Sequence, residues 1–157
     1  MTCRKLKLNN QLCFKLYTAS RLITKAYEPY FRPLGITYTQ YLVLMVLWEH
    51  DHQPVNDIAK ALFLETNTVT PLIQRMEKAG LVERIRGCED CRQRIVSLTE
   101  QGRELERKGR KIPSCMSHLL QEQGLEEDEL YAIAPVLDRM ICSLSEPQTK
   151  DEQSKSE

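Results

Sequence analysis

The stretch "VNDIAKALFLETNTVTPLIQRMEKAGLVERI", residues 55–85, decides the fold. Its apolar spacing predicts a short helix over 55–62, a tight turn, and a second helix over about 66–79 that Gly80 ends. A helix tolerates proline best near its beginning, so Pro71 also favours a start at Thr66 to Thr68. Two helices joined by a tight turn predict a helix-turn-helix.

After Gly80 the apolar residues recur with a period of two. The segments "LVERIRG" (81–87) and "QRIVSLT" (93–99) therefore predict two strands, and the polar, glycine-led "GCEDCR" (87–92) predicts the turn between them. A helix pair followed by a β-hairpin makes a winged helix-turn-helix over residues 55–99.

Helical spacing extends on both sides of this unit. The predicted helices cover residues 9–31, 39–49, 100–123 (interrupted by Pro113) and 124–144, and "HDHQP" (50–54) is a turn. The helix over 39–49 is apolar nearly all round, which indicates a buried scaffold helix. The expected fold is mainly α with a small β-hairpin, in one domain over 1–145. Its flanks, 8–36 and 100–145, are helical, and the tail, 146–157, is expected to be disordered.

Composition excludes some classes of protein. The longest apolar run, "YLVLMVLW" (41–48), is far shorter than the roughly 20 residues of a membrane span, and no apolar region follows the basic N-terminus. We therefore expect a cytoplasmic protein without a membrane partner. The net charge is zero, but residues 1–54 carry 7 basic and 3 acidic side chains while residues 122–157 carry 3 and 10. A basic first part suits a polyanion partner.

The second helix of the pair fits the major groove of DNA and offers polar side chains to base edges. The candidates for these contacts are Thr66, Asn67, Thr68, Thr70, Gln74 and Arg75. The hairpin carries Arg84, Arg86, Arg92 and Arg94, and an arginine at its tip suits a narrow minor groove. The alternative is a helix pair and hairpin that serve packing or protein contacts.

Two segments resemble the MarR family of transcriptional regulators. "DCRQRIVSLTEQG" (90–102) is similar to that family's wing, and "VTPLIQRMEKAGLVERIR" (69–86) to its recognition helix and first wing strand. The resemblance implies a homodimer whose dimerisation helices, within 8–36 and 100–145, interdigitate between subunits. It also implies that the winged helices reach successive major grooves of a pseudo-palindromic, double-stranded operator. It also implies that Arg92 enters the minor groove and that Asp90 positions it.

Cys13 lies in "NQLCFKLYTAS" (10–20), on an amphipathic helix where a cysteine is usually a small core residue. Together with "YEPYFRPLGITYTQYLVLMVLWEH" (27–50), however, the segment resembles the organic hydroperoxide regulators, the OhrR branch of the family. This resemblance implies that Cys13 is the peroxide-reactive thiol, that Tyr27 and Tyr38 bond its sulfur, and that Tyr17 lies nearby.

The implied function is that of a repressor that holds DNA when reduced. An organic hydroperoxide, the inducer, oxidises Cys13 to a sulfenic acid. The sulfenic acid alone, or the disulfide that it then forms with Cys115 of the other subunit or with a small thiol, disturbs the Tyr27 and Tyr38 contacts, and the operator is released.

Other functions stay open from the sequence. A repressor could respond to a small aromatic ligand or to general oxidative stress, and a structural dimerisation module is a further class. A thiol peroxidase is not expected, and we expect neither an enzyme nor a bound cofactor or metal. Cys88 and Cys91 suit zinc, a redox pair or incidental thiols, while His50 and His52 are expected in a polar loop and Cys3 and Cys142 to be incidental.

Overall fold

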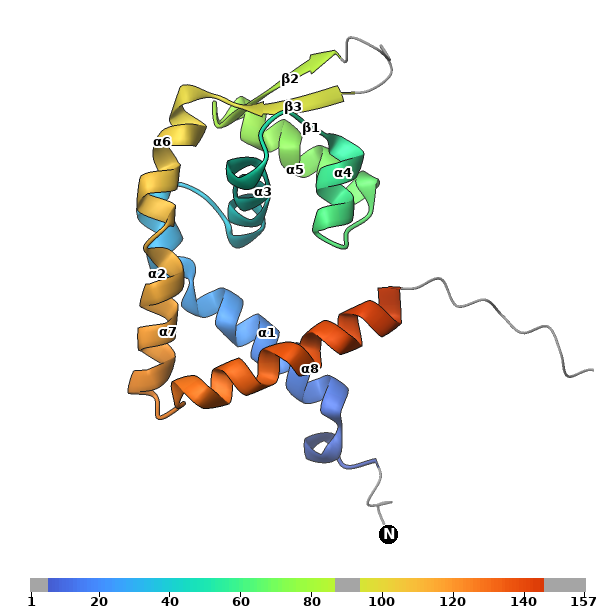
Figure 1. Ribbon diagram of the computed structural model, residues 1–157, viewed down its shortest axis with the longest axis vertical. Coiled ribbons are helices and arrows are strands. Elements are labelled where there is room, and N and C mark those ends of the chain that lie inside the picture. Colours follow the sequence, from blue (N-terminus) through green and yellow to red (C-terminus); the bar gives the residue numbers. More distant parts are fainter. Residues whose placement is uncertain (1–5, 87–93, 146–157) are drawn as a thin grey trace, which may run out of the picture. The chain divides into compact units, whose positions relative to one another are not determined.

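The computed structural model describes residues 6–86 and 94–145. The chain divides into two compact units within α7 (Ile112–Glu122), and the first unit ends at Met116. Figure 1 traces the elements. In the part of the chain that is described, no helix has both the length and the apolar character needed to cross a bilayer.

The predicted helix over 9–31 is wrong as a single element. A 3-10 turn, η2 (Leu8–Asn10), precedes α1 (Leu12–Ala26), and the chain continues as α2 (Glu28–Phe31) and the 3-10 turn η3 (Arg32–Leu34). Pro29 explains the break, because it has no N–H to donate to the preceding turn and is instead accommodated in the first turn of α2. Gly35, in the left-handed conformation with φ 67°, ends η3.

The helix α3 (Tyr38–Glu49) forms the centre of the first unit. It begins one residue earlier than predicted because Thr37 and Gln40 form a capping box, in which each side chain accepts a hydrogen bond from the other's backbone N–H. Tyr41, Leu44 and Leu47 are among its buried side chains, which confirms the predicted scaffold helix.

The helix-turn-helix consists of α4 (Val55–Ala61) and α5 (Thr66–Lys78), as predicted to within one residue at each end. Phe63, in the turn, has the left-handed φ of 53°. Pro71 lies in the second turn of α5, so the carbonyl of Asn67 lacks its usual helical donor.

The sheet contains a strand that the sequence did not predict. The predicted hairpin is present as β2 (Val82–Arg86) and β3 (Arg94–Leu98), paired antiparallel with Arg84 opposite Val96. On the other side of β3 lies β1 (Gln53–Pro54), with Gln53 opposite Val96, where a turn was expected. A proline is acceptable there because β1 is an edge strand. In Figure 1 the sheet lies beside α3, α4 and α5.

The helix predicted over 100–123 with an interruption at Pro113 is two helices, α6 (Glu100–Gly109) and α7. Thr99 caps α6 as predicted, by accepting a hydrogen bond from the N–H of Gly102. Pro113 lies in the first turn of α7 and causes the break. The last helix, α8 (Glu127–Ser145), begins later than predicted, after Gly124 with its φ of 85°. The predicted tail, 146–157, lies outside the described residues.

One hydrophobic core joins α3, α4, α5 and the sheet. It extends from Phe31 and Ile36 through α3 to Val69, Ile73 and Met76 of α5. The strands β2 and β3 and the helix-turn-helix therefore have fixed positions relative to α3, the helix that also carries Tyr38.

Candidate nucleic-acid interface and sensor site

The helix α5 presents one polar face to solvent. Its apolar face is buried, so the exposed side chains belong to a surface held rigidly from below. The predicted contact residues Thr66, Asn67, Thr68, Gln74 and Arg75 are exposed, while Thr70 is half-buried.

Hydrogen bonds distinguish these candidates further. The hydroxyl of Thr70 donates to the carbonyl of Thr66 at 2.8 Å, and that of Thr66 donates to the side-chain oxygen of Asn56 in α4 at 3.1 Å. Both hydroxyls thus serve the helix and its junction. Gln74 and Arg75 make no side-chain hydrogen bond or ion pair within the described residues, and this leaves both free to contact a ligand.

The arginines of the predicted wing have different environments. Arg84 forms an ion pair with Glu77 of α5, with 2.6 Å between Nη2 and Oε2 and 2.8 Å between Nε and Oε2. The hydrogen bond from Arg84 lowers the pKa of Glu77, which keeps the pair charged. Arg84 therefore fastens β2 to the recognition helix, a role that the sequence did not indicate.

The tip of the wing lies outside the described residues. This applies to Asp90 and Arg92, and to Cys88 and Cys91. Arg86 is the last residue of β2, and the side chain of Arg94, at the beginning of β3, is exposed.

Cys13 lies in the first turn of α1 and is exposed as a free thiol. Tyr17, one turn later, is 66% exposed, and Leu12 beside them is 60% exposed. Residues four apart share one side of a helix. The structure thus places Cys13 and Tyr17 on neighbouring, uncovered parts of α1.

Tyr27 and Tyr38 form a pair at the other end of α1. Their ring centroids are 5.2 Å apart, and Tyr27 also stacks on Phe31 at 5.4 Å. Burial, together with the neighbouring Tyr38 and Tyr41, raises the pKa of Tyr27, so its phenol stays protonated and can donate a hydrogen bond. This is the chemistry expected of a partner for a thiolate.

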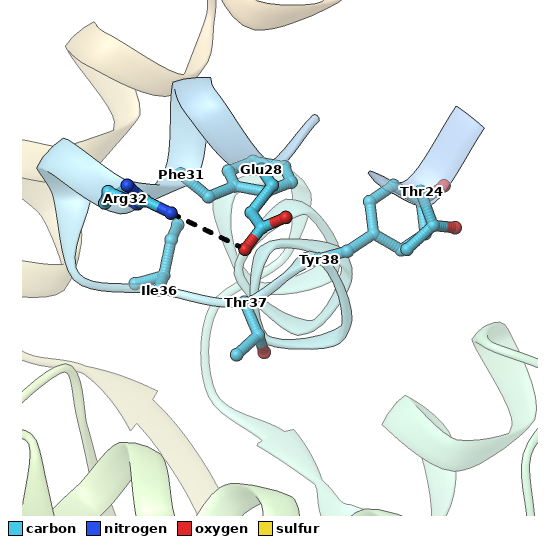
Figure 2. Close-up of a pocket in the computed structure, with 7 residues that line it drawn as sticks. All are labelled: Thr24, Glu28, Phe31, Arg32, Ile36, Thr37 and Tyr38. Carbon is cyan, nitrogen blue, oxygen red and sulfur yellow. Dashed lines mark ion pairs between the residues drawn. The ribbon is translucent and has the colours of Figure 1, made fainter. Parts of the chain in front are cut away.

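A pocket of about 400 Å³ opens beside this pair. Figure 2 shows Tyr38 and Thr24 on one side of it and the Glu28–Arg32 ion pair, at 3.9 Å, on the other. Phe31, Ile36 and Thr37 complete the lining, which is largely apolar. The pocket suits a small molecule with an apolar body and a polar end.

Within one chain, Cys13 and Tyr27 do not meet. Both lie on α1 or at its end, and at 1.5 Å per residue they are about 21 Å apart along the helix axis. The single chain therefore brings together Tyr27 and Tyr38 but not the cysteine predicted to bond them.

The other cysteines among the described residues are Cys115 and Cys142. Cys115, in the first turn of α7, is half-buried, and Cys142 of α8 is exposed. Among residues 6–86 and 94–145, no group of three or more potential ligands could hold a metal ion.

The segment containing His50 and His52 is more than the polar loop that was expected. Asp51 accepts hydrogen bonds from the N–H of Leu98 at 2.9 Å and from the guanidinium of Arg103 at 2.8 Å. The ring of His52 is hydrogen-bonded to the hydroxyl of the buried Ser97 at 2.7 Å. This network ties the end of α3 to β3 and α6. Spacing gave no signal for it, because its partners are about 50 residues apart.

Comparisons with known proteins match this arrangement. The family model for the transcriptional regulator SarA/Rot matches residues 25–108. The organic hydroperoxide resistance transcriptional regulator of Bacillus subtilis (strain 168) is 44% identical over 125 residues, which cover 80% of this chain and 85% of that protein. The regulator MgrA of Staphylococcus aureus is 33% identical, over 91% of this chain and 96% of its own.

Solved structures show the same relationship. Reduced AbfR bound to DNA has a TM-score of 0.72 and 37% identity, and the match covers 89% of this chain and 95% of that one. AbfR, from Staphylococcus epidermidis, is also known overoxidized on DNA and with a disulfide formed. The chain therefore belongs to the MarR family of winged-helix transcriptional regulators and, within it, to the branch of the organic hydroperoxide regulators.

Proposed function

We propose that the protein is a dimeric, cytoplasmic repressor that releases a pseudo-palindromic operator when an organic hydroperoxide oxidises Cys13. The observation that carries this proposal is the Tyr27–Tyr38 pair, two phenols whose ring centroids are 5.2 Å apart beside a largely apolar pocket. Such a site can hold a thiolate by hydrogen bonds and an alkyl hydroperoxide by its apolar body. The relatives described above are regulators, in agreement with a protein that is not an enzyme.

The sensor is assembled between two subunits. Cys13 is exposed and about 21 Å along α1 from Tyr27, so the sulfur that Tyr27 and Tyr38 bond comes from the partner chain. Leu12, Leu22 and Ile23 leave an apolar surface on α1 that a dimer would cover. A dimer thus brings Tyr27 and Tyr38 of one subunit to Cys13 of the other, and it covers the apolar surface of α1.

The chemical step is a two-electron oxidation of sulfur. The Cys13 thiolate attacks the distal oxygen of the hydroperoxide; a sulfur–oxygen bond forms, the O–O bond breaks, and the alkoxide takes a proton to leave as an alcohol. The sulfenic acid then condenses with a second thiol, and water leaves as the disulfide forms. That thiol is either Cys115 of the partner subunit or a small thiol, and intact-protein mass distinguishes the two.

DNA binding is carried by α5 and the wing. Asn67, Thr68, Gln74 and Arg75 reach into the major groove, while Thr66 and Thr70 hold the beginning of the helix. Arg86, Arg92 and Arg94 contact the backbone and minor groove from the wing, with Asp90 positioning Arg92. Replacement R75A is expected to weaken operator binding roughly five-fold or more, because one guanidinium contact contributes about 1–3 kcal/mol.

The test is fluorescence anisotropy on the DNA upstream of the protein's own gene, with and without cumene hydroperoxide. Wild type and the control C142S, which removes another exposed thiol, are expected to be released, whereas C13S is expected to stay bound. Release of C13S by the peroxide would place the sensor elsewhere. Release of all three by a small aromatic carboxylate, with no response to peroxide, would instead support ligand sensing through the pocket.

A further inference from the structure

Aromatic rings form a continuous chain from the Tyr27–Tyr38 pair to Trp48, near the end of α3. Beyond the Tyr27–Tyr38 pair, Phe31 lies 5.4 Å from Tyr27 and 5.0 Å from Tyr41, and Tyr41 lies 5.8 Å from Trp48 (centroid distances). Phe31 and Tyr41 are buried, 3% and 4% exposed. Close-packed side chains transmit strain, so this chain of rings is a route by which a displacement of Tyr27 or Tyr38 can reach Trp48.

The last two rings of this chain are hydrogen-bonded to α6. The hydroxyl of Tyr41 donates to the carbonyl of Gly109 at 3.1 Å, and the indole N–H of Trp48 donates to the carbonyl of Gly102 at 3.0 Å. The two donors, Tyr41 and Trp48, are seven residues or about two helical turns apart, and so are the two acceptors, Gly102 and Gly109. The two bonds therefore attach α6 to α3 at matching positions on each helix.

The hydrogen bond from Tyr41 to Gly109 replaces one that the helix itself cannot make. In a continuous helix the carbonyl of Gly109 would accept from the N–H of residue 113, but Pro113 has none. Tyr41 supplies the missing donor at a buried site, where an unsatisfied carbonyl is costly.

The helix α6 packs closely against its neighbours because Gly102 and Gly109 have no side chains. A Cβ on Gly109 would lie 2.7 Å from Cη2 of Trp48, and one on Gly102 would lie 2.2 Å from the carbonyl oxygen of Leu81. These distances are too short for any larger residue. The helix α6 consequently lies directly against the Trp48 ring, and against the junction between α5 and β2.

The beginning of α6 is in turn fixed to the end of the recognition helix. Thr99 donates through its hydroxyl to the carbonyl of Gly80 at 2.6 Å, and its N–H donates to the carbonyl of Leu81 at 3.2 Å. Gly80 and Leu81 follow Ala79, the C-cap of α5. A movement of α6 at Gly102 is thereby passed to the end of α5 and the base of the wing.

We propose that Tyr41 and Trp48 are the positioning residues that couple the sensor pair to the DNA-binding surface. This inference rests on the proposed function, since it assumes that oxidation of Cys13 disturbs Tyr27 and Tyr38. The disturbed rings press on Phe31 and Tyr41, and the two hydrogen bonds carry the shift to α6. Neither residue lines the pocket beside Tyr38, and neither is among the predicted DNA contacts.

The test measures the release factor, which is the operator Kd of the oxidised protein divided by that of the reduced protein. Y41F keeps the ring and loses only the hydroxyl. It is expected to reduce the release factor about five-fold, since one hydrogen bond is lost, while the rate of Cys13 oxidation stays unchanged. The control Y30F removes a phenol that packs against the core outside the ring chain and should keep the wild-type factor.

A merely structural role would give a different result. Y41F would then be less stable to heat but would keep the wild-type release factor, and this outcome overturns the inference. W48F, which removes the other donor, must reduce the factor too, and it replaces Y41F if that variant does not fold. If peroxide does not release the wild-type protein from its operator, the proposed function itself is refuted, and the coupling with it.

Discussion

At the scale of single residues, Asp51 holds three parts of the winged-helix region together. Its carboxylate follows α3 and accepts hydrogen bonds from Leu98, which ends β3, and from Arg103 of α6. Burial alone would raise the pKa of Asp51, but the bonds from Leu98, Arg103 and His52 outweigh it and lower the pKa. The folded protein thus favours the charged carboxylate.

We expect D51N to lower the free energy of unfolding by about 1–2 kcal/mol at pH 7, because the amide accepts weaker hydrogen bonds from Leu98 and Arg103. Because the pKa of Asp51 is lower in the folded than in the unfolded protein, the stabilisation by its carboxylate is fully present above the unfolded pKa of about 3.9. It is lost as the pH falls through the folded pKa. Urea unfolding at pH 7 and at a pH well below the unfolded value checks both points. A difference from wild type that persists in acid, or one matched by D57N at the exposed Asp57, would contradict this role.

The hydroxyl of Tyr27 is expected to affect the rate of sensing but not DNA binding. Y27F keeps the ring against Phe31 and Tyr38 and removes a donor to the Cys13 thiolate. Oxidation of Cys13 should slow about ten-fold, which corresponds to about 1.4 kcal/mol for one hydrogen bond to a charged group. Trapping of the sulfenic acid over time measures the rate, and Y30F is the control. Equal rates in Y27F and wild type would exclude Tyr27 as a partner of the sulfur.

At the scale of the elements, the turn between α4 and α5 contains backbone strain. Phe63 has a φ of 53° and is 67% exposed, so its side chain gains little from burial. Non-glycine residues pay about 1–2 kcal/mol in this conformation. We expect F63G to be about 1 kcal/mol more stable than F63A, since both lose the ring and only glycine relieves the strain.

The same pair of replacements at Lys60, exposed within α4, should give the opposite order, with alanine more stable than glycine by about 1 kcal/mol. Thermal or chemical unfolding of the four variants decides the matter. If alanine were preferred at both positions, the turn would not carry the strain assigned to Phe63.

Local spacing predicted most elements, and failed where backbone pairing or proline decides. The pattern over 55–99 gave α4, α5 and the hairpin strands to within a residue or so, because one face of each is buried. It missed β1, whose two residues pair with Val96 and Ile95 across some forty positions of sequence. It also joined helices across Pro29, and it placed the later interruption at Pro113, whereas α6 ends at Gly109 and α7 begins at Ile112. Cys13, Tyr27 and Tyr38 came from resemblance, whereas the bonds of Asp51, Tyr41 and Trp48 needed the fold.

At the scale of the whole molecule, exposed apolar side chains predict a stable dimer. Leu12, Leu22 and Ile23 on α1 are each at least 38% exposed. The helix α8 adds Ile133, Val136, Ile141 and Leu144, each at least 45% exposed, at helical spacing. A single chain leaves these surfaces uncovered, so we expect homodimers whose unfolding midpoint rises with protein concentration.

Replacement I23D should raise the dimer dissociation constant at least roughly 100-fold, because it places a charge in a buried apolar contact. The control K25D brings in the same side chain on a different side of α1 and should leave the dimer intact. Sedimentation equilibrium separates these outcomes. An I23D protein that stays dimeric would remove α1 from the interface.

The central claim, that oxidation of Cys13 releases the operator, is tested most directly by following both quantities in one titration. Labelled operator is released in steps by cumene hydroperoxide, and at each step the fraction of Cys13 still open to alkylation is measured by mass spectrometry. The account predicts that the released fraction rises in step with the oxidised fraction of Cys13. Release while Cys13 remains fully alkylated, or full oxidation of Cys13 with the operator still bound, would contradict it.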